Sequence, residues 1–221
     1  MKVKKKAKGI LLIDEHPIIR DAIALTLSRD PDLQMVGWSK EPGQAIALLA
    51  KEPPDLVLME IALNGGNGIE LIKRMVAQDP QIPILVLSQH DEDLYAERSF
   101  RAGAKGFITK KSEAAEILVA IQTVLKGKHY FSSSISTKLW DKVWTGNSEK
   151  EKSPVETLTD RELQVLELIG KGTKTSAIAE LLGISMKTVE TYRGKLKEKF
   201  DLRDGAQLAR HAVEWVSQQA K

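Results

Sequence analysis

The stretch Ile184-Ser-Met-Lys-Thr-Val-Glu-Thr-Tyr-Arg-Gly-Lys-Leu-Lys-Glu-Lys-Phe200 predicts one amphipathic helix. Ser185 stands where an N-cap belongs, because its hydroxyl can accept a hydrogen bond from an N–H group of the first turn. Val189, Leu196 and Phe200 recur at helical spacing and form an apolar stripe. Five basic and two acidic residues surround that stripe, which suits a helix that lies in the DNA major groove. An ordinary solvated surface helix carries similar charges, so this segment alone leaves both interpretations open.

The residues before this helix predict two further helices. Thr159-Asp-Arg-Glu162 is a capping box that begins the first helix, and Gly170-Lys-Gly172 ends it. Thr175 is expected to cap the second helix, which Gly183 ends. Two helices joined by a tight glycine turn, the second of them basic, are typical of a helix-turn-helix. A last helix is expected from about Asp204.

The order of these residues resembles the LuxR-type helix-turn-helix. The matching stretches are Leu158-Thr-Asp-Arg-Glu162, Ile178-Ala-Glu-Leu-Leu-Gly-Ile-Ser185 and Thr188-Val-Glu-Thr-Tyr-Arg193. The resemblance implies a DNA-binding domain. On its basic helix we expect contacts to base edges from Glu190, Thr191 and Lys195, and contacts to phosphates from Lys187, Thr188, Arg193 and Lys199.

The composition restricts the class of protein. A chain of 221 residues is long enough for two domains that each have a core. Because there is no cysteine, disulfides and thiolate metal sites are excluded, and the composition fits a cytoplasmic protein. No apolar run approaches the roughly 20 residues of a membrane helix, so no membrane partner is expected. The net charge of +3 is small for a nucleic-acid binder, so the DNA prediction rests on the motif order.

Residues 9–125 alternate between short apolar runs and amphipathic segments. We expect strands at 9–14, 33–38, 56–59, 82–87 and 105–108, and helices at 17–28, 42–50, 69–76, 92–102 and 112–125. This alternation predicts a doubly wound α/β domain with a five-stranded parallel sheet. The whole chain is therefore expected to be α/β followed by an all-α, four-helix domain. A site in the first domain should lie beyond the carboxyl ends of the strands.

Polar residues stand at those strand ends. Asp14 and Glu15 follow the first strand, Glu60 the third and Ser88 the fourth, while the fifth leads into Lys110. Each alone is an ordinary turn or cap residue, but their joint placement indicates a site. This set resembles the receiver domain of two-component response regulators, and the whole chain resembles a NarL/FixJ-type response regulator. The stretches that carry the resemblance are Leu12-Ile-Asp-Glu-His-Pro17, Pro54-Asp-Leu-Val-Leu-Met-Glu60, Val86-Leu-Ser88 and Gly103-Ala-Lys-Gly-Phe-Ile-Thr-Lys110.

The resemblance implies a role for each residue of this pocket. In the family, the position of Glu60 is an aspartate that accepts a phosphoryl group from a sensor histidine kinase or a small phosphodonor. The metal-binding, pairing and switch positions around it correspond to Asp14, Glu15, Ser88, Phe107 and Lys110. The resemblance implies that Asp14 and Glu15 bind Mg²⁺ and that Lys110 pairs with the phosphoryl group. It also implies that Ser88 hydrogen-bonds this group and moves together with Phe107.

Glu60 departs from the family pattern. Its carboxylate stands one methylene further out, on the order of 1.5 Å, and a displacement of about 1 Å can cost ~100-fold in rate. The segment Ala62-Leu-Asn-Gly65 also differs from the asn-met-pro-gly that is usual there. We therefore expect a phosphorylation-independent regulator. Glu60 either imitates the phosphorylated state or leaves the receiver silent in an ion pair with Lys110; residual phosphorylation is the third interpretation. The glutamate can be natural or engineered.

No cofactor is required by this interpretation. Mg²⁺ remains compatible with the hard oxygen ligands of Asp14, Glu15 and Glu60. We place the receiver at residues 8–126, a linker that contains a helix at 127–154, and the LuxR-type domain at 155–221. Ser132-Ser-Ser134 can cap the linker helix, which would continue through Leu139, Trp140, Val143 and Trp144.

Duplex DNA, a second copy of the chain and a sensor histidine kinase are the expected partners. The resemblance implies that the free DNA-binding domain pairs through its last helix, with Leu208, Ala212 and Trp215 as the pairing face. Packing of these three residues inside their own domain is the alternative. The competing function is an adaptor that docks a kinase or another regulator. An enzyme is not expected, because no nucleophile–base pair is evident.

Overall fold

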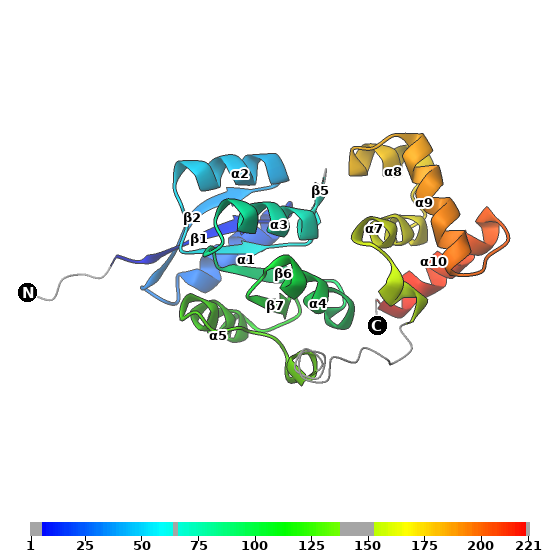
Figure 1. The fold of residues 1–221 in the computed structure, drawn as a ribbon. Coiled ribbons are helices and arrows are strands. Elements are labelled where there is room, and N and C mark those ends of the chain that lie inside the picture. Colours follow the sequence, from blue (N-terminus) through cyan, green and yellow to red (C-terminus); the bar gives the residue numbers. More distant parts are fainter. Residues whose placement is uncertain (1–5, 64–65, 138–152, 220–221) are drawn as a thin grey trace, which may run out of the picture. The chain divides into compact units, whose positions relative to one another are not determined.

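The computed structural model describes residues 6–63, 66–137 and 153–219 of the chain (Figure 1). The chain divides into two compact units, Met1–Trp144 and Thr145–Lys221, and each unit is described by itself below. Within the described residues, no helix has both the length and the apolar character that crossing a bilayer demands.

Strands and helices alternate along the first unit (Figure 1). Its main strands are β1 (Lys8–Ile13), β2 (Leu33–Ser39), β3 (Leu56–Met59), β6 (Ile84–Ser88) and β7 (Gly106–Thr109). Its helices are α1 (Pro17–Leu27), α2 (Pro42–Lys51), α3 (Gly68–Gln78), α4 (Glu92–Ala102) and α5 (Ala114–Leu125). The strands form one parallel sheet in the order β2-β1-β3-β6-β7. The predicted doubly wound domain is therefore confirmed.

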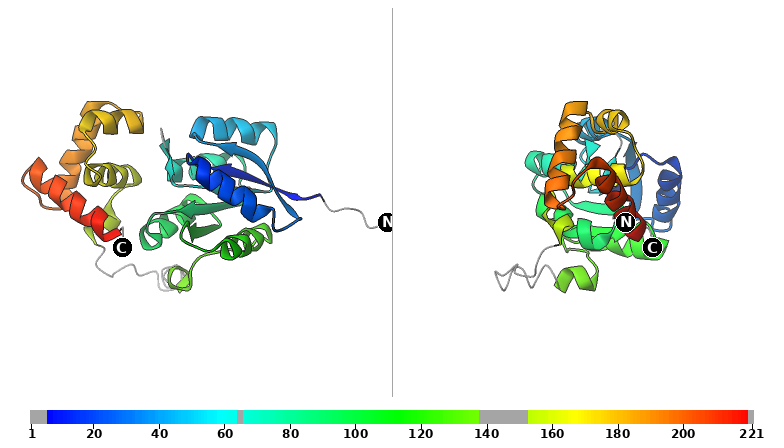
Figure 2. Two further views of the ribbon diagram at one scale, coloured as in Figure 1. Left: turned by 180° about the vertical axis from the view of Figure 1, so that it is seen from behind. Right: turned by 90° about the vertical axis from the view of Figure 1, so that its right-hand side faces the viewer.

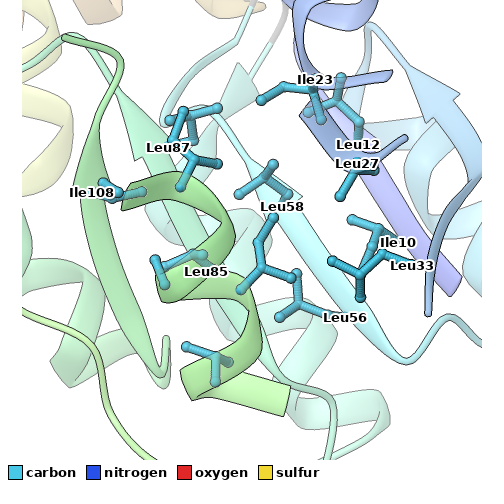
Figure 3. Close-up of a cluster of buried hydrophobic side chains, with 14 residues drawn as sticks. Ile10, Leu12, Ile23, Leu27, Leu33, Leu56, Leu58, Leu85, Leu87 and Ile108 are labelled. Carbon is cyan, nitrogen blue, oxygen red and sulfur yellow. The ribbon is translucent and has the colours of Figure 1, made fainter. Parts of the chain in front are cut away.

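Both faces of this sheet are covered by helices. Helices α1 and α5 lie on one face, and α2, α3 and α4 lie on the other (Figures 1 and 2). Alternate strand residues such as Leu12, Leu58 and Leu87 point toward Leu27 and the other core residues of α1 and α5 (Figure 3). Because their neighbours in each strand are buried on the opposite face, the strands read as continuous apolar runs.

A short antiparallel hairpin, β4 (Ala62–Leu63) and β5 (Gly66–Asn67), connects β3 to α3 and was not predicted. The Asn67 side chain caps α3 by accepting a hydrogen bond from the Glu70 amide at 3.2 Å. The Gly68 amide donates to the Ile61 carbonyl at 3.0 Å, and a Cβ at position 68 would lie 2.4 Å from that oxygen. Only glycine therefore fits at this close approach.

The chain beyond α5 continues to pair with the sheet. Tyr130 forms a parallel bridge with Gly106 of β7, the edge strand. The Phe107 amide donates to the Tyr130 carbonyl at 2.8 Å, and the Tyr130 amide donates to the Lys105 carbonyl at 3.0 Å. A Cβ at Gly106 would lie 2.7 Å from the Tyr130 carbonyl oxygen, so the missing side chain makes room for the backbone at Tyr130.

The residues that follow also pack on the first unit. The rings of His129 and Phe131 contact the ring of Phe100 on α4. Residues 133–137 are helical, with the Ser132 hydroxyl accepting a hydrogen bond from the Ile135 amide at 3.3 Å. Ile135 itself is buried. The continuation of this predicted helix through Leu139, Trp140, Val143 and Trp144 lies outside the described residues.

The second unit is helical, as predicted (Figure 1). Its elements are a 3₁₀ turn η1 (Pro154–Thr157) and the helices α7 (Asp160–Gly170), α8 (Thr175–Leu182), α9 (Met186–Lys199) and α10 (Gly205–Gln219). Thr159 and Glu162 form the predicted capping box of α7, with hydrogen bonds of 3.3 and 2.8 Å. Gly183, at φ +62°, ends α8 in the left-handed region. Ser185 caps α9, where its hydroxyl accepts a hydrogen bond from the Thr188 amide at 3.0 Å.

The predicted cap at Thr175 is wrong. Lys174 is the N-cap residue of α8 and makes no side-chain cap, while Thr175 is the first residue of the helix. The Thr175 hydroxyl instead donates to the Glu190 carboxylate of α9 at 3.1 Å. The sequence shows a threonine at the right place for a cap, but it does not show that a tertiary acceptor competes for the hydroxyl.

Candidate functional sites

Four polar side chains meet beyond the carboxyl ends of the parallel strands. Asp14 follows β1, Glu60 follows β3, Ser88 ends β6 and Lys110 follows β7. Asp14, Glu60 and Ser88 are each at most 1% exposed. The parallel topology brings these positions to one edge of the sheet, so the predicted convergence is seen in the structure.

Glu60 is the centre of this pocket. Its Oε1 atom accepts hydrogen bonds from the Ser88 hydroxyl at 2.5 Å, from the Ile61 amide at 2.6 Å and from the Ala62 amide at 3.2 Å. Its Oε2 atom lies 2.8 Å from the Lys110 ammonium. The charge of this buried carboxylate is therefore met by a hydroxyl, two backbone amides and a cation.

Lys110 bridges two carboxylates. Its Nζ atom lies 2.5 Å from Asp14 Oδ2 and 2.8 Å from Glu60 Oε2, and the side chain is 10% exposed. Burial by itself lowers the pKa of Lys110, but the charge of Glu60 and the hydrogen bonds to Asp14 and Glu60 raise it above its ordinary value. The ammonium therefore stays charged at neutral pH and offsets one of the two buried negative charges.

Asp14 is held by His16 and Trp38, for which the sequence predicts no role. Its Oδ1 atom accepts hydrogen bonds from the backbone amide of His16 and pairs with the imidazole Nδ1 of the same residue, each at 2.9 Å. The indole N–H of Trp38 donates to the Asp14 carbonyl at 2.8 Å. His16 is visible in the sequence as a neighbour of Asp14, but no pattern connects Trp38 with it.

The carboxylates do not form a ready metal site. Among the described residues, no group of three or more histidine, aspartate or glutamate side chains is arranged to hold a metal ion. Asp14 Oδ2 and Glu60 Oε2 are buried and face the Lys110 ammonium, and neither has another hydrogen-bond partner among the described residues. Glu15 Oε1 lies 3.8 Å from His16 Nε2, while Glu15 Oε2 is buried and has no hydrogen-bond partner among the described residues. The use of Asp14, Glu15 and Glu60 for Mg²⁺ stays a prediction, and each of the three has a buried carboxylate oxygen without a hydrogen-bond partner other than Lys110 among the described residues.

Phe107, which the resemblance assigns to the switch, lies in β7 with its side chain 1% exposed. Its strand pairs with β6, where Val86 is its partner, and its amide donates a hydrogen bond to the Tyr130 carbonyl. The aromatic ring is thus directed into the core at the same time as the Ser88 hydroxyl is bonded to Glu60.

The predicted DNA-contacting residues of α9 differ in their exposure. Lys187, Glu190, Thr191 and Lys195 are exposed, whereas Thr188 and Arg193 are half-buried. The Thr191 hydroxyl donates to the Lys187 carbonyl at 2.9 Å, so it can offer a base only its acceptor lone pairs. Lys195 Nζ lies 5.9 Å from the centre of the half-buried Tyr192 ring. The exposed side chains leave a polar and basic surface on this helix.

Lys199 has a structural contact that the sequence did not reveal. Its ammonium lies 2.7 Å from the Glu162 carboxylate and donates to the Thr157 carbonyl at 3.1 Å. Burial alone raises the pKa of Glu162, but the hydrogen bonds from Lys199 and Thr159 hold it below its usual value. Lys199 therefore joins the end of α9 to the start of α7, and these contacts use two of the three N–H donors of its ammonium.

The predicted pairing residues of α10 are also largely internal. Leu208 and Ala212 are fully buried within one chain, and Trp215 is half-buried. A Cβ at Gly170 would lie 2.4 Å from the Ala212 carbonyl oxygen, so α7 and α10 approach closely there. Leu208 and Ala212 thus pack inside their own domain, and of the three residues only Trp215 keeps surface that a partner could contact.

Both units match known families. Residues 10–122 match the response regulator receiver domain, and residues 156–212 match the luxR family of bacterial regulatory proteins. The chain is 33% identical over 205 residues to the response regulator GacA of Pseudomonas aeruginosa, which covers 92% of this chain and 94% of GacA. It is also 33% identical to the transcriptional regulatory protein LiaR of Bacillus subtilis, over 92% of this chain and 95% of LiaR. Both relatives are regulators, so the prediction that the chain is not an enzyme is confirmed.

Solved structures agree with this fold. RcsB of Salmonella enterica serovar Typhimurium, bound to the promoter rprA, superimposes with a TM-score of 0.66 at 21% identity, covering 94% of this chain and 99% of that chain. A LuxR-family response regulator from Aurantimonas sp. SI85-9A1 gives a TM-score of 0.58 at 31% identity, covering 62% of this chain and 99% of that chain. The protein therefore belongs to the NarL/FixJ-type response regulators, DNA-binding transcription regulators in which a receiver domain precedes a LuxR-type helix-turn-helix domain.

Proposed function

We propose that this regulator acts on its target DNA without phosphoryl transfer to its receiver, because Glu60 supplies a permanent negative charge in the pocket. The observation that carries the proposal is the set of contacts of the Glu60 carboxylate: Ser88, two backbone amides and Lys110 all bind it within 3.2 Å. These are donors that a transferred phosphoryl group would otherwise occupy according to the family resemblance.

The same contacts argue against Glu60 as a nucleophile. Glu60 Oε1 accepts three hydrogen bonds, so attack on phosphorus by this oxygen would require at least one of them to break, and Oε2 is held against the Lys110 ammonium. The side chain is also 1% exposed. In-line attack tolerates little misplacement, and the extra methylene adds to it. A sensor histidine kinase is then not needed to activate the protein.

The Glu60–Lys110 ion pair is compatible with both imitation and silence, and the Ser88 contact is the one that favours imitation of the phosphorylated state. In the family, the hydroxyl at the position of Ser88 binds the phosphoryl group and moves together with the aromatic residue at the position of Phe107. Here the Ser88 hydroxyl donates a hydrogen bond to Glu60, and the Phe107 ring is buried. We therefore assign the receiver a constitutively active arrangement, with Glu60 in place of the transient signal.

On DNA, we place α9 in the major groove. The residues that face base edges are Glu190, Thr191 and Lys195. The residues that face phosphates are Lys187, Thr188 and Arg193. The protein is a cytoplasmic homodimer that reads two half-sites about one helical turn apart. Trp215, which keeps part of its surface on α10, is the residue of the predicted set that we assign to the pairing of the two domains.

Incubation with acetyl phosphate and Mg²⁺ should leave the wild-type protein without acid-labile phosphate. Its affinity for a selected duplex should also stay constant, because Glu60 already occupies the donors of the pocket. Intact-mass spectrometry measures the phosphate, and fluorescence anisotropy measures the affinity. The matched variant is Glu60→Asp, which restores the shorter side chain of the family. Phosphate on Glu60 of the wild type, together with tighter DNA binding, would overturn the proposal.

Replacing Lys187 by alanine should weaken binding to all duplexes alike. Lys187 is exposed in the first turn of α9, and a lost phosphate contact flattens the slope of log affinity against log salt by about one unit. The matched control is Lys171→Ala, which removes an exposed lysine at the end of α7. A change of base preference in Lys187→Ala, or an equal change of slope in the control, would contradict this assignment.

A further inference from the structure

The Glu190 carboxylate on α9 is held by groups from two helices. The Thr175 hydroxyl at the start of α8 donates to Glu190 Oε1 at 3.1 Å. The Arg193 Nε atom, one turn further along α9, lies 3.5 Å from the same oxygen. The Glu190 side chain nevertheless remains 60% exposed. One oxygen is thus fixed by the domain, while the side chain still faces solvent.

Arg193 is itself held in place. Its side chain is 21% exposed, and its Nη2 atom would lie 3.4 Å from a Cβ at Gly205, the first residue of α10. The guanidinium therefore lies against the start of α10 while its Nε faces the carboxylate. Contacts from α8, α9 and the start of α10 together restrict the orientation of one acidic side chain on the helix that we assign to DNA.

The surface beside Glu190 is open. Gly194 lies four residues further along the helix and so on the same face, and no atom lies within 4 Å of the place where its Cβ would be. A base edge can approach the helix there without meeting a side chain. A carboxylate only accepts hydrogen bonds, and in the major groove the exocyclic amino group of cytosine is the donor that acidic side chains recognise.

A free carboxylate in the groove would be repelled by the phosphates. The guanidinium of Arg193 reduces this repulsion, and the Thr175 hydroxyl limits the rotamers that the side chain must give up on binding. We propose that Thr175 and Arg193 are positioning residues that direct Glu190 at a cytosine in each half-site, an inference that rests on the proposed placement of α9 in the major groove. The three residues then determine specificity as one unit.

The test compares Thr175→Val, Thr175→Ser and Glu190→Ala in the full-length protein. Duplexes selected from a randomised library by the wild type are remade with each base at every half-site position, and affinities are measured at several salt concentrations. Glu190→Ala should lose about 10-fold of the preference for cytosine at one position. Thr175→Val should lose roughly 3-fold to 10-fold at the same position, because the carboxylate is no longer oriented. Thr175→Ser, which keeps the hydroxyl, should retain the preference.

The salt dependence separates positioning from a general weakening of the fold. All three variants should keep the wild-type salt slope, since none of them removes a phosphate contact. The inference is refuted if Thr175→Val weakens every duplex equally or keeps the full cytosine preference, or if Glu190→Ala changes no base preference. If the proposed DNA-binding function itself were wrong, the wild type would select no duplex, and this result is distinct from the outcomes of the variants.

Discussion

Replacing Lys110 by methionine is expected to lower the free energy of unfolding of the receiver by about 3–5 kcal/mol at neutral pH. The ammonium lies between the Asp14 and Glu60 carboxylates, which are both essentially inaccessible to water. Methionine keeps most of the volume of the side chain but removes the charge. Two buried carboxylates would then share one pocket without a cation, and the desolvation of their charges would no longer be offset.

The slowest hydrogen exchange in β1, β3 and β6 measures this loss, because amides in the central strands open only with the whole domain. Their exchange in Lys110→Met should be faster by on the order of 10²–10⁴. The control is Lys111→Met, which changes the exposed neighbouring lysine and should exchange like the wild type. Adding Glu60→Gln to Lys110→Met should recover part of the loss, since one of the two negative charges is removed.

An unchanged exchange rate in Lys110→Met would show that the contacts of Lys110 with Asp14 and Glu60 contribute nothing to stability.

The pH dependence of the stability that Lys110 contributes follows from its raised pKa. A group whose pKa is higher in the folded state contributes fully below its unfolded pKa, which is near 10.5 for lysine. The contribution is lost only as the pH rises through the higher folded value, so it is complete over the physiological range.

Alanine at Gly170 and alanine at Gly194 should change the stability of the DNA-binding domain in opposite directions. A Cβ at Gly170 would meet the Ala212 carbonyl oxygen at 2.4 Å and a Val216 methyl at 2.5 Å. Since the Ala212 oxygen belongs to the backbone of α10, the two helices must move apart, at a cost of about 1–3 kcal/mol. A Cβ at Gly194 meets nothing, so alanine there should add about 0.5–1 kcal/mol through its helix propensity.

Urea unfolding of the full-length protein, followed by circular dichroism, compares the two variants with the wild type. Both substitutions are the same chemical change near or within a helix, so each is the control for the other. If Gly170→Ala is as stable as the wild type, the close approach of α7 and α10 is incorrect. Gly194→Ala also reports on function, because a new methyl group on the open face of α9 should weaken DNA binding without weakening the fold.

Much of the fold can be predicted from local patterns. The apolar runs around Leu12 and Leu58 and the amphipathic helices between them specify a doubly wound sheet, and the capping box at Thr159 and the cap at Ser185 specify helix starts. These features depend on residues that are neighbours in the sequence. The β4–β5 hairpin is different, because two-residue strands have no periodicity to detect.

In the pocket, the convergence of the side chains can be predicted from the sequence, whereas their detailed contacts cannot. Parallel topology alone predicts that Asp14, Glu60, Ser88 and Lys110 converge. It does not predict that the lysine lies between both carboxylates, or that Trp38 donates to the Asp14 carbonyl. In the second unit, Lys199 has the charge of a phosphate contact, but its position beside Glu162 depends on how α9 packs against α7.

The bridge between Tyr130 and β7 determines where the chain can be divided. A fragment that stops at Lys126 would keep all five helices of the receiver but would leave the Phe107 amide and the Lys105 carbonyl on an open sheet edge. Open edges invite strand addition from other chains, so such a fragment would tend to self-associate for reasons unrelated to signalling. A receiver prepared for biophysical work should therefore extend at least through residue 137.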